Sequence, residues 1–456
     1  MTSRVLTTGT DVRRELLDRL ASVRELRGPA WVDFTAEIRE VVLIASSSRG
    51  GSSMVSEILR RSGHLLHLRG EINPFLRLVG LGYPDSGTGS DRLDAGHLAA
   101  LEPAARDLLN AELARDVGRM TDTVDDGRYV LDVAWRIAVQ WPDLPMDLAA
   151  VADIALSVLR RLRARHRWAD GEVRDIGLYF RSLLADLAGH GLPVDPRYYD
   201  LPGDRDGWAA APAAPAAPAA TGRAPGRTLV EEPPFVLTVP WRGVDRRHPP
   251  DRPLVIKTPA NAYRPEFLRA LFPRARFRVL HLTRNPAAAV SGLYDGWRYD
   301  GFHACRMPEA LEIGGYVEKA EENRWWWKFD LPPAWQEFTR APLFDVCAFQ
   351  WRSAHQAVLA DLARGGTDSL RMRFEDLISG PESRIASFER LSAWLGIPLD
   401  GAFRRAVYEG IGPVVATVRP RPGRWRARAA PIERALGPRE LEVADRLGYG
   451  DRTEWI

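Results

Sequence analysis

Residues 41–63 read VVLIASSSRGGSSMVSEILRRSG. The first five residues form a short, mostly β-branched run, which is typical of a buried strand in a parallel sheet. A turn rich in serine and glycine follows, and a helix is expected after it, ending at Gly63. A strand, a glycine-rich turn and a helix in this order predict the first unit of a nucleotide-binding α/β fold.

Three further segments extend this unit into a sheet. LVIKT at 254–258 and FRVLHLT at 277–283 are again short apolar runs, and a fourth strand is expected at 369–374. A helix should begin near Pro286, because proline suits the first turn of a helix. Amphipathic helices are also expected at 381–395 and 438–447. The sequence therefore predicts an α/β protein, a P-loop-like three-layer sandwich around a central parallel sheet.

A long segment of different character separates the first strand unit from the second. Residues 85–200 are predicted to be mostly helical, with one short strand at 129–133. Residues 209–226, AAAPAAPAAPAATGRAPG, are an Ala/Pro-rich linker that cannot form a core, so we expect it to be disordered or loosely tethered. We therefore expect one domain over 1–450 with a helical insertion at 85–250.

Composition excludes several classes of protein. A net charge of +3 over 456 residues is too small for a general nucleic-acid binder. Two cysteines, Cys305 and Cys347, cannot build a disulfide scaffold or a cysteine-rich zinc site. The chain has no run of about 18 apolar residues and its N-terminus lacks a signal-peptide core, so a cytoplasmic protein without a membrane span is expected.

Each of three predicted strands delivers one cation at its carboxyl end: Arg49, Lys257 and Arg284. Ligands of open α/β sheets bind at these strand ends. Only three of the 63 basic residues are lysines, which makes a lysine in such a position informative. Taken singly, each site also fits an ordinary strand–helix connection or a surface cation. Together they predict a crevice for an anionic ligand, with backbone N–H groups of the glycine-rich turn as further donors.

With these residues in place, the sequence resembles the sulfotransferases that use 3′-phosphoadenosine 5′-phosphosulfate (PAPS). Residues 49–53, RGGSS, resemble the family's 5′-phosphosulfate loop, and VLHLTRNPAAAVS at 279–291 resembles its 3′-phosphate motif. The stretch 271–286 is especially similar to tyrosylprotein and bacterial members. Residues 371–397 resemble a later strand–helix segment, and GRWR at 423–426 resembles the C-terminal basic loop. The resemblance covers about 40–76, 250–300 and 340–450.

The resemblance implies a role for each matching position. Arg49, Gly50, Gly51, Ser52 and Ser53 would hold the 5′-phosphosulfate, Lys257 would stabilise the sulfuryl group, and Arg284, Ser291 and Arg424 would hold the 3′-phosphate. PAPS would be the donor and 3′-phosphoadenosine 5′-phosphate (PAP) the product, without a metal. The partner would be a small molecule with a hydroxyl group: an alcohol, a phenol or a sugar.

The sequence also departs from the family pattern. Gly50 stands where serine is common, and the spacing from Arg284 to Ser291 is one residue shorter than usual. Pro259 stands where the cytosolic animal enzymes have a catalytic histidine. In tyrosylprotein and trehalose sulfotransferases a glutamate follows the first helix, and Glu71 occupies that place. Glu71 is therefore the expected general base, with His64 and His67 as alternatives.

Other interpretations stay open at this point. A kinase on the same fold is one, although the Walker pattern GxxxxGK[ST] is absent. A non-catalytic module that binds the nucleotide or a partner is another. Trp325, Trp326, Trp327 and Trp335 are either acceptor walls or core residues. The sequence does not determine the oligomeric state, and a homodimer stays open as one alternative.

Overall fold

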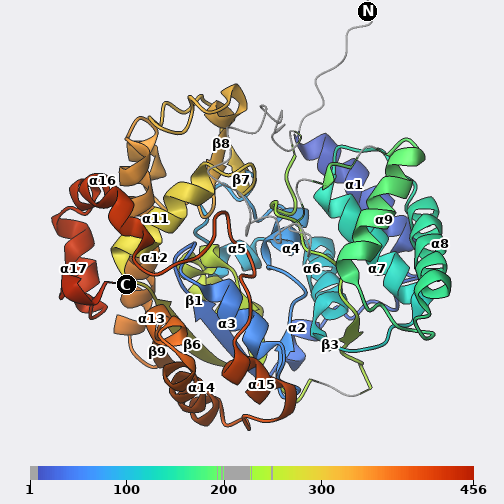
Figure 1. Cartoon of the computed structure of the whole chain (residues 1–456). Coiled ribbons are helices and arrows are strands. Elements are labelled where there is room, and N and C mark those ends of the chain that lie inside the picture. Colours follow the sequence, from blue (N-terminus) through green and yellow to red (C-terminus); the bar gives the residue numbers. More distant parts are fainter. Residues whose placement is uncertain are drawn as a thin grey trace, which may run out of the picture.

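The computed structural model describes residues 9–455 apart from 193, 197, 198, 200–225, 227, 248 and 249. Its centre is a mostly parallel seven-stranded sheet with the strand order β4-β3-β2-β5-β1-β6-β9 (Figure 1). All neighbours in this sheet pair in parallel except the two pairs that involve β3. The strands are β1 (Glu40–Ala45), β2 (Leu66–His67), β3 (Gly118–Met120), β4 (Trp241–Gly243), β5 (Leu254–Lys257), β6 (Arg276–Thr283) and β9 (Asp368–Arg373).

The predicted α/β fold and its four strands are confirmed. β1 is central because every residue from Val41 to Ala45 is buried, and it pairs with β5 on one side and β6 on the other. Its side chains alternate between the faces of the sheet, as strand geometry requires. Val42 and Ile44 belong to one apolar cluster, whereas Val41 and Leu43 belong to another.

Helices cover both faces of the sheet. The face of Val42 packs against α3 (Ser52–Leu59), α14 (Pro381–Leu395) and α15 (Gly401–Glu409). The opposite face packs against α10 (Pro265–Leu271) and part of α12 (Leu343–Ala363). Another cluster joins α12 to α11 (Pro286–Trp297), α16 (Ala429–Ala435), α17 (Pro438–Arg446) and the hairpin of β7 (His303–Arg306) and β8 (Trp326–Lys328). The predicted helices after Pro286, Pro381 and Pro438 are therefore confirmed.

The segment predicted as a helical insertion, called the inserted segment below, contains several helices. It contains α5 (Ala95–Ala99), α6 (Pro103–Asp116), α7 (Asp126–Gln140), α8 (Leu148–His166) and α9 (Ile176–Gly189), and α7 to α9 gather at one end of the molecule in Figure 1. The segment also adds β3 and β4 to the sheet. The predicted linker lies outside the described residues except for Gly226.

The strand predicted at 129–133 is wrong, because these residues belong to α7. The Asp125 side chain caps this helix by accepting from the Arg128 N–H, at 2.8 Å. Tyr129, Val130, Val133 and Ile137 are buried at helical spacing, so packing of that face outweighs the local β propensity of the sequence.

Of the four tryptophans that the sequence offered as acceptor walls or core residues, three are buried in the structure. Trp327 and Trp335 are buried in the cluster of α11 and α12, Trp326 is buried against the His303 ring, and Trp325 is exposed. The N-terminal helix α1 (Gly9–Arg24) packs through Leu16 and Leu20 into the apolar cluster that contains α7 and α8. Among the described residues, every helix is too short or too polar to cross a bilayer.

Candidate active site

The three predicted strand-end cations meet at one edge of the sheet. β5, β1 and β6 are parallel neighbours, so Lys257, the turn at 46–51 and Arg284 all follow carboxyl ends that lie side by side. This is the edge at which open α/β sheets bind ligands.

The glycine-rich turn is built so that glycine is required twice. Gly51 has φ +97, and a Cβ there would lie 2.1 Å from Cδ2 of Phe374. A Cβ on Gly50 would lie 2.2 Å from the Ser46 Oγ and 2.8 Å from the Ser47 carbonyl oxygen. A serine at position 50 therefore does not fit this turn, which explains the departure from the family pattern. α3 begins directly afterwards at Ser52, so its first N–H groups have no acceptor within the helix.

Arg49 and Arg284 are joined to each other. Arg49 has a left-handed backbone, with φ 62, and its carbonyl oxygen accepts from Arg284 Nη1 at 3.0 Å. Its guanidinium lies 5.3 Å from the centre of the Phe302 ring. Phe302 is itself left-handed and stacks on Phe329, which is left-handed too. Such backbone strain in three contacting residues is a feature of functional sites.

Arg284 is a cation without an anion. Its guanidinium packs over the Phe374 ring at 4.8 Å, and none of the described carboxylates lies within ion-pair distance of it. Burial lowers its pKa to about 10, and the nearby Arg424 adds to this, while Glu375 opposes it. The Glu375 carboxylate is bound instead to Asn285 and to Tyr449. A half-buried guanidinium in this state is suited to an anionic ligand.

Ser291 lies on α11, the helix that follows Arg284 and that binds Arg424. The hydroxyl of Ser291 is buried and has no hydrogen-bond partner among the described residues. One turn later, Asp295 binds Arg424 at 2.5 Å and Arg428 at 2.7 Å, which ties the C-terminal basic loop to α11. A Cβ on Gly292 would lie 3.9 Å from Arg284 Nη1, so the shorter spacing does not carry this turn of the helix away from Arg284.

Lys257 and Glu71 form an ion pair, with 2.6 Å between Nζ and Oε1. The two residues follow neighbouring parallel strands, β5 and β2. Their side chains keep 17% and 31% of their exposure, so both reach solvent. The sequence predicted both residues as catalytic but did not predict their direct contact. The Ile72 N–H also donates to the Thr258 hydroxyl at 3.2 Å, which fixes the two loops together.

The loop that carries Glu71 is anchored to the inserted helices. The Arg69 N–H donates to Asp116 Oδ2 at 2.9 Å, and the Arg69 guanidinium binds Asp132 at 2.5 Å. Asp132 also binds Arg27 of the chain's N-terminal region at 2.9 Å, and all these side chains are buried. Sequence inspection missed this cluster because its partners are 47 and 63 residues from Arg69.

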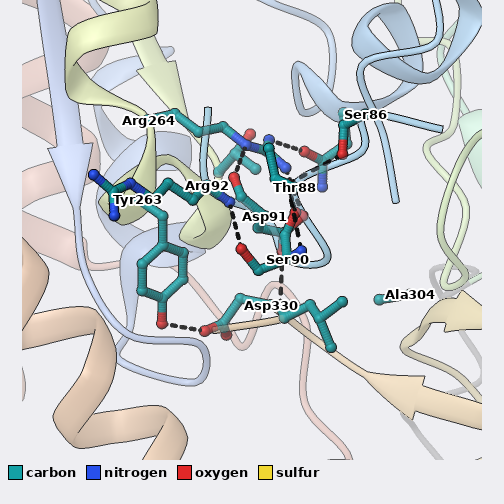
Figure 2. Close-up of polar contacts among 12 residues, drawn as sticks. Ser86, Thr88, Ser90, Asp91, Arg92, Tyr263, Arg264, Ala304 and Asp330 are labelled. Atoms are coloured by element: carbon teal, nitrogen blue, oxygen red, sulfur yellow. Dashed lines mark hydrogen bonds and ion pairs between the residues drawn. The ribbon is translucent and has the colours of Figure 1, made fainter. Parts of the chain in front are cut away.

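A second buried cluster supports the glycine-rich turn. Asp330 accepts from the Ser48 hydroxyl at 2.6 Å and from the Tyr263 hydroxyl at 2.9 Å. Figure 2 shows Asp330 beside Tyr263 and near the ion pair of Asp91 with Arg264, which measures 2.6 Å. Burial raises the pKa of Asp330 to about 6, although both hydroxyls favour its ionised form. No motif in the sequence marked Asp330.

The two alternative bases are poorly placed. His64 precedes β2 and pairs with Asp400 at 3.2 Å, so it lies at the amino end of the strands. His67 lies within β2, where burial and the charge of Arg60 lower its pKa to about 3. Neither histidine is at the edge that holds Lys257 and Arg284.

Comparison with known proteins gives only distant likenesses. No family model and no curated protein matches the chain. Among solved structures, the sulfotransferase domain from the curacin biosynthetic pathway is 12% identical with a TM-score of 0.35, over 90% of this chain and 98% of that one. A sulfotransferase from Mycobacterium avium is 15% identical with a TM-score of 0.36, over 98% of this chain and 87% of that one. These likenesses are too distant to assign a family, and the fold rests on the strand order itself.

Proposed function

We propose that this protein is a PAPS-dependent sulfotransferase that acts on a hydroxyl group of a small molecule, an alcohol, phenol or sugar. One observation carries the proposal. The half-buried Arg284 has no carboxylate partner among the described residues, and it adjoins Arg49, Arg424 and the turn of α11 that bears the unsatisfied Ser291 hydroxyl. This set fits a phosphate group, and the Lys257–Glu71 pair lies at the same edge of the sheet.

The chain's residues divide into two groups under this proposal. Arg49, the N–H groups of residues 51–53 and the hydroxyls of Ser52 and Ser53 would hold the 5′-phosphosulfate at the start of α3, whereas the Gly50 N–H donates to the Ser47 carbonyl oxygen at 3.1 Å. Arg284, Ser291 and Arg424 would hold the 3′-phosphate.

The remaining two residues would act on the group in transfer. PAPS supplies an activated sulfuryl group when bound. Because such transfers pass through a loose transition state with charge on the oxygens, positioning and fixed cations supply most of the catalysis. Lys257 Nζ would face the transferring oxygens, and Glu71 would accept the proton of the acceptor hydroxyl.

The donor is tested by thermal unfolding with PAP and, separately, with ATP and magnesium. A ligand that binds only the folded state raises the melting temperature by mass action. PAP should stabilise the protein, and ATP with magnesium should do so less. Stabilisation by ATP and magnesium alone would overturn the proposal and favour a kinase. The acceptor is then sought by transfer of radiolabelled sulfate from PAPS to extracts of the source organism.

A further inference from the structure

The guanidinium group of Arg49 rests on a stack of two phenylalanine rings. Its Cζ lies 5.3 Å from the centre of the Phe302 ring, and this ring stacks on Phe329, with 4.8 Å between the ring centres and 26° between the planes. Each contact uses a face of the Phe302 ring, and one face has room for one group, so the guanidinium and Phe329 lie on opposite faces. Phe302 therefore lies between the cation of the glycine-rich turn and the apolar cluster of α11 and α12, to which Phe329 belongs.

The backbone fixes both rings of this stack. The Phe302 N–H donates to the Pro233 carbonyl oxygen at 2.6 Å, and the Phe302 carbonyl oxygen accepts from the Phe329 N–H at 3.1 Å. Phe302 has φ 60 and Phe329 has φ 62, a left-handed backbone that bulky residues rarely adopt. Such strain persists only where the surrounding structure fixes it, and it is typical of functional sites. The Phe302 ring is therefore held by its own backbone contacts and does not depend on Arg49 for its position.

Helix α11 leaves space for the stack at a glycine. A Cβ on Gly296 would lie 2.3 Å from Cζ of Phe329, so a larger residue would push this ring away from Phe302. Glycine is a poor helix former, yet it occupies this position within α11. The same helix follows Arg284 and carries Ser291. The helix beside the proposed phosphate site thus carries a destabilising residue where the second ring of the stack needs the space.

The C-terminal loop also contacts the Arg49 guanidinium. Its Nη1 donates to the Val415 carbonyl oxygen at 3.3 Å. A ring face and a carbonyl oxygen attract a cation without neutralising it, so both contacts leave its charge in place for an anion. An arginine side chain loses rotamer freedom when it is ordered, and a guanidinium that is already held has less freedom to lose when a ligand binds. Contacts of this kind are suited to holding a ligand-binding cation ready.

We propose that Phe302 is a positioning residue that holds the Arg49 guanidinium towards the 5′ group of the bound nucleotide. The inference rests on the proposed sulfotransferase function, in which Arg49 binds the 5′-phosphosulfate. Phe302 acts through Arg49, since its ring contacts the guanidinium. Loss of the ring should therefore weaken the binding of nucleotides that carry a 5′-phosphate and spare those that carry only a 3′-phosphate.

Calorimetric titration with two nucleotides tests this selectivity. PAP carries both phosphates, whereas adenosine 3′-monophosphate lacks the 5′-phosphate that Arg49 would bind. Phe302→Leu keeps an apolar side chain but removes the ring, and it should weaken PAP binding about fivefold, the scale of one cation–π contact. Its affinity for adenosine 3′-monophosphate should equal that of the wild type. Unchanged PAP binding, or equal weakening of both nucleotides, would overturn the proposal.

A double-mutant cycle separates positioning from a packing role. In an Arg49→Gln background, Phe302→Leu should have no further effect on PAP affinity, because the ring acts through the guanidinium. Phe302→Tyr keeps the ring face and should bind PAP as the wild type does. Phe338→Leu is the control, because Phe338 is also a half-buried ring stacked on another, Phe349, at 3.9 Å, and it should keep wild-type affinity.

The outcomes distinguish this inference from the function on which it rests. If the effects of Arg49→Gln and Phe302→Leu multiply, the ring does not act through the guanidinium and the positioning role is wrong, while PAP binding by the wild type still supports the proposed function. A wild type that binds neither nucleotide would instead reject the proposed function, and this inference with it.

Discussion

The two sides of this edge of the sheet balance their charges differently. On the side of β6 and α11, Arg284 has no carboxylate partner among the described residues and the Ser291 hydroxyl is unsatisfied. On the side of β5 and β2, Lys257 is paired with Glu71. The first side is therefore incomplete without an anion, whereas the second is complete without a ligand and suited to moving a proton.

The sides also differ in how they are anchored. The proposed nucleotide side is built on the strand–turn–helix units of β1 and β6, which contact each other and the C-terminal loop. The proposed acceptor side depends instead on the inserted segment, above all on the buried contacts of Arg69 with Asp116 and Asp132. Damage to the insertion should therefore weaken the proposed acceptor side more than the proposed nucleotide side.

The largest effect is expected from Asp132→Ala. This change leaves two buried guanidinium groups, Arg27 and Arg69, without a shared carboxylate, which should lower the free energy of unfolding by about 3–5 kcal/mol. Asp186→Ala on α9 is the matched control within the inserted helices, since its largely exposed pair with Arg161 should contribute about 1 kcal/mol or less. Urea denaturation measures both, and equal losses would contradict the anchoring role.

Lys257→Ala and Glu71→Gln test the acceptor side itself. Each should lower sulfuryl transfer at least about 100-fold, because removing one such group costs roughly 3–4 kcal/mol of transition-state stabilisation. Affinity for PAP should change little, since neither residue is assigned to a phosphate. Lys319→Ala is the control, because Lys319 is exposed and pairs with Asp300 and not with Glu71. Near-normal turnover of Glu71→Gln would remove Glu71 from the base role.

The same contrast explains what the sequence could reveal. Arg49, Lys257 and Arg284 could be placed from sequence because strand ends of one parallel sheet meet at one edge, whatever lies between them. Asp132 and Asp330 could not, because their contacts with Arg69 and with the Ser48 hydroxyl depend on how the insertion and the loop after β8 pack against the sheet. The strand expected at 129–133 failed for a related reason: Tyr129 and Val133 favour strands locally, but tertiary packing of the α7 face decides.

Arg284→Gln tests the nucleotide side. It should weaken PAP binding by about 2 kcal/mol, or about 30-fold, which is the usual value of hydrogen bonds to a charged group. Arg276→Gln at the start of the same strand is the control, because its exposed pair with Asp368 is at the opposite edge of the sheet. Calorimetric titration with PAP compares them. Equal affinity of Arg284→Gln and the wild type would show that an unneutralised arginine here does not indicate a phosphate site.

Lys328→Met tests whether another cation without a carboxylate partner contributes to PAP binding, as proposed for Arg284. Lys328 is 1% exposed, donates to the Tyr299 carbonyl oxygen, and has no ion-pair partner within the described part of the chain. Burial lowers its pKa to about 7, and the nearby Lys319 adds to this. Between pH 7 and about 10.5 the unfolded chain binds more protons at this group than the folded protein, so stability rises with pH over that range.

Methionine removes the cost of burying the lysine charge. The free energy of unfolding of Lys328→Met should therefore exceed that of the wild type by about 1–2 kcal/mol at pH 7, and this difference should shrink towards pH 10. Its affinity for PAP should equal that of the wild type. Thermal unfolding at the two pH values, with and without PAP, measures both effects. If the variant lost PAP binding, lack of a carboxylate would not separate ligand-binding cations from structural ones. If the variant keeps PAP binding, Arg284 differs from Lys328 in its exposure to ligands. The half-buried guanidinium of Arg284 can contact a ligand, whereas the buried side chain of Lys328 cannot.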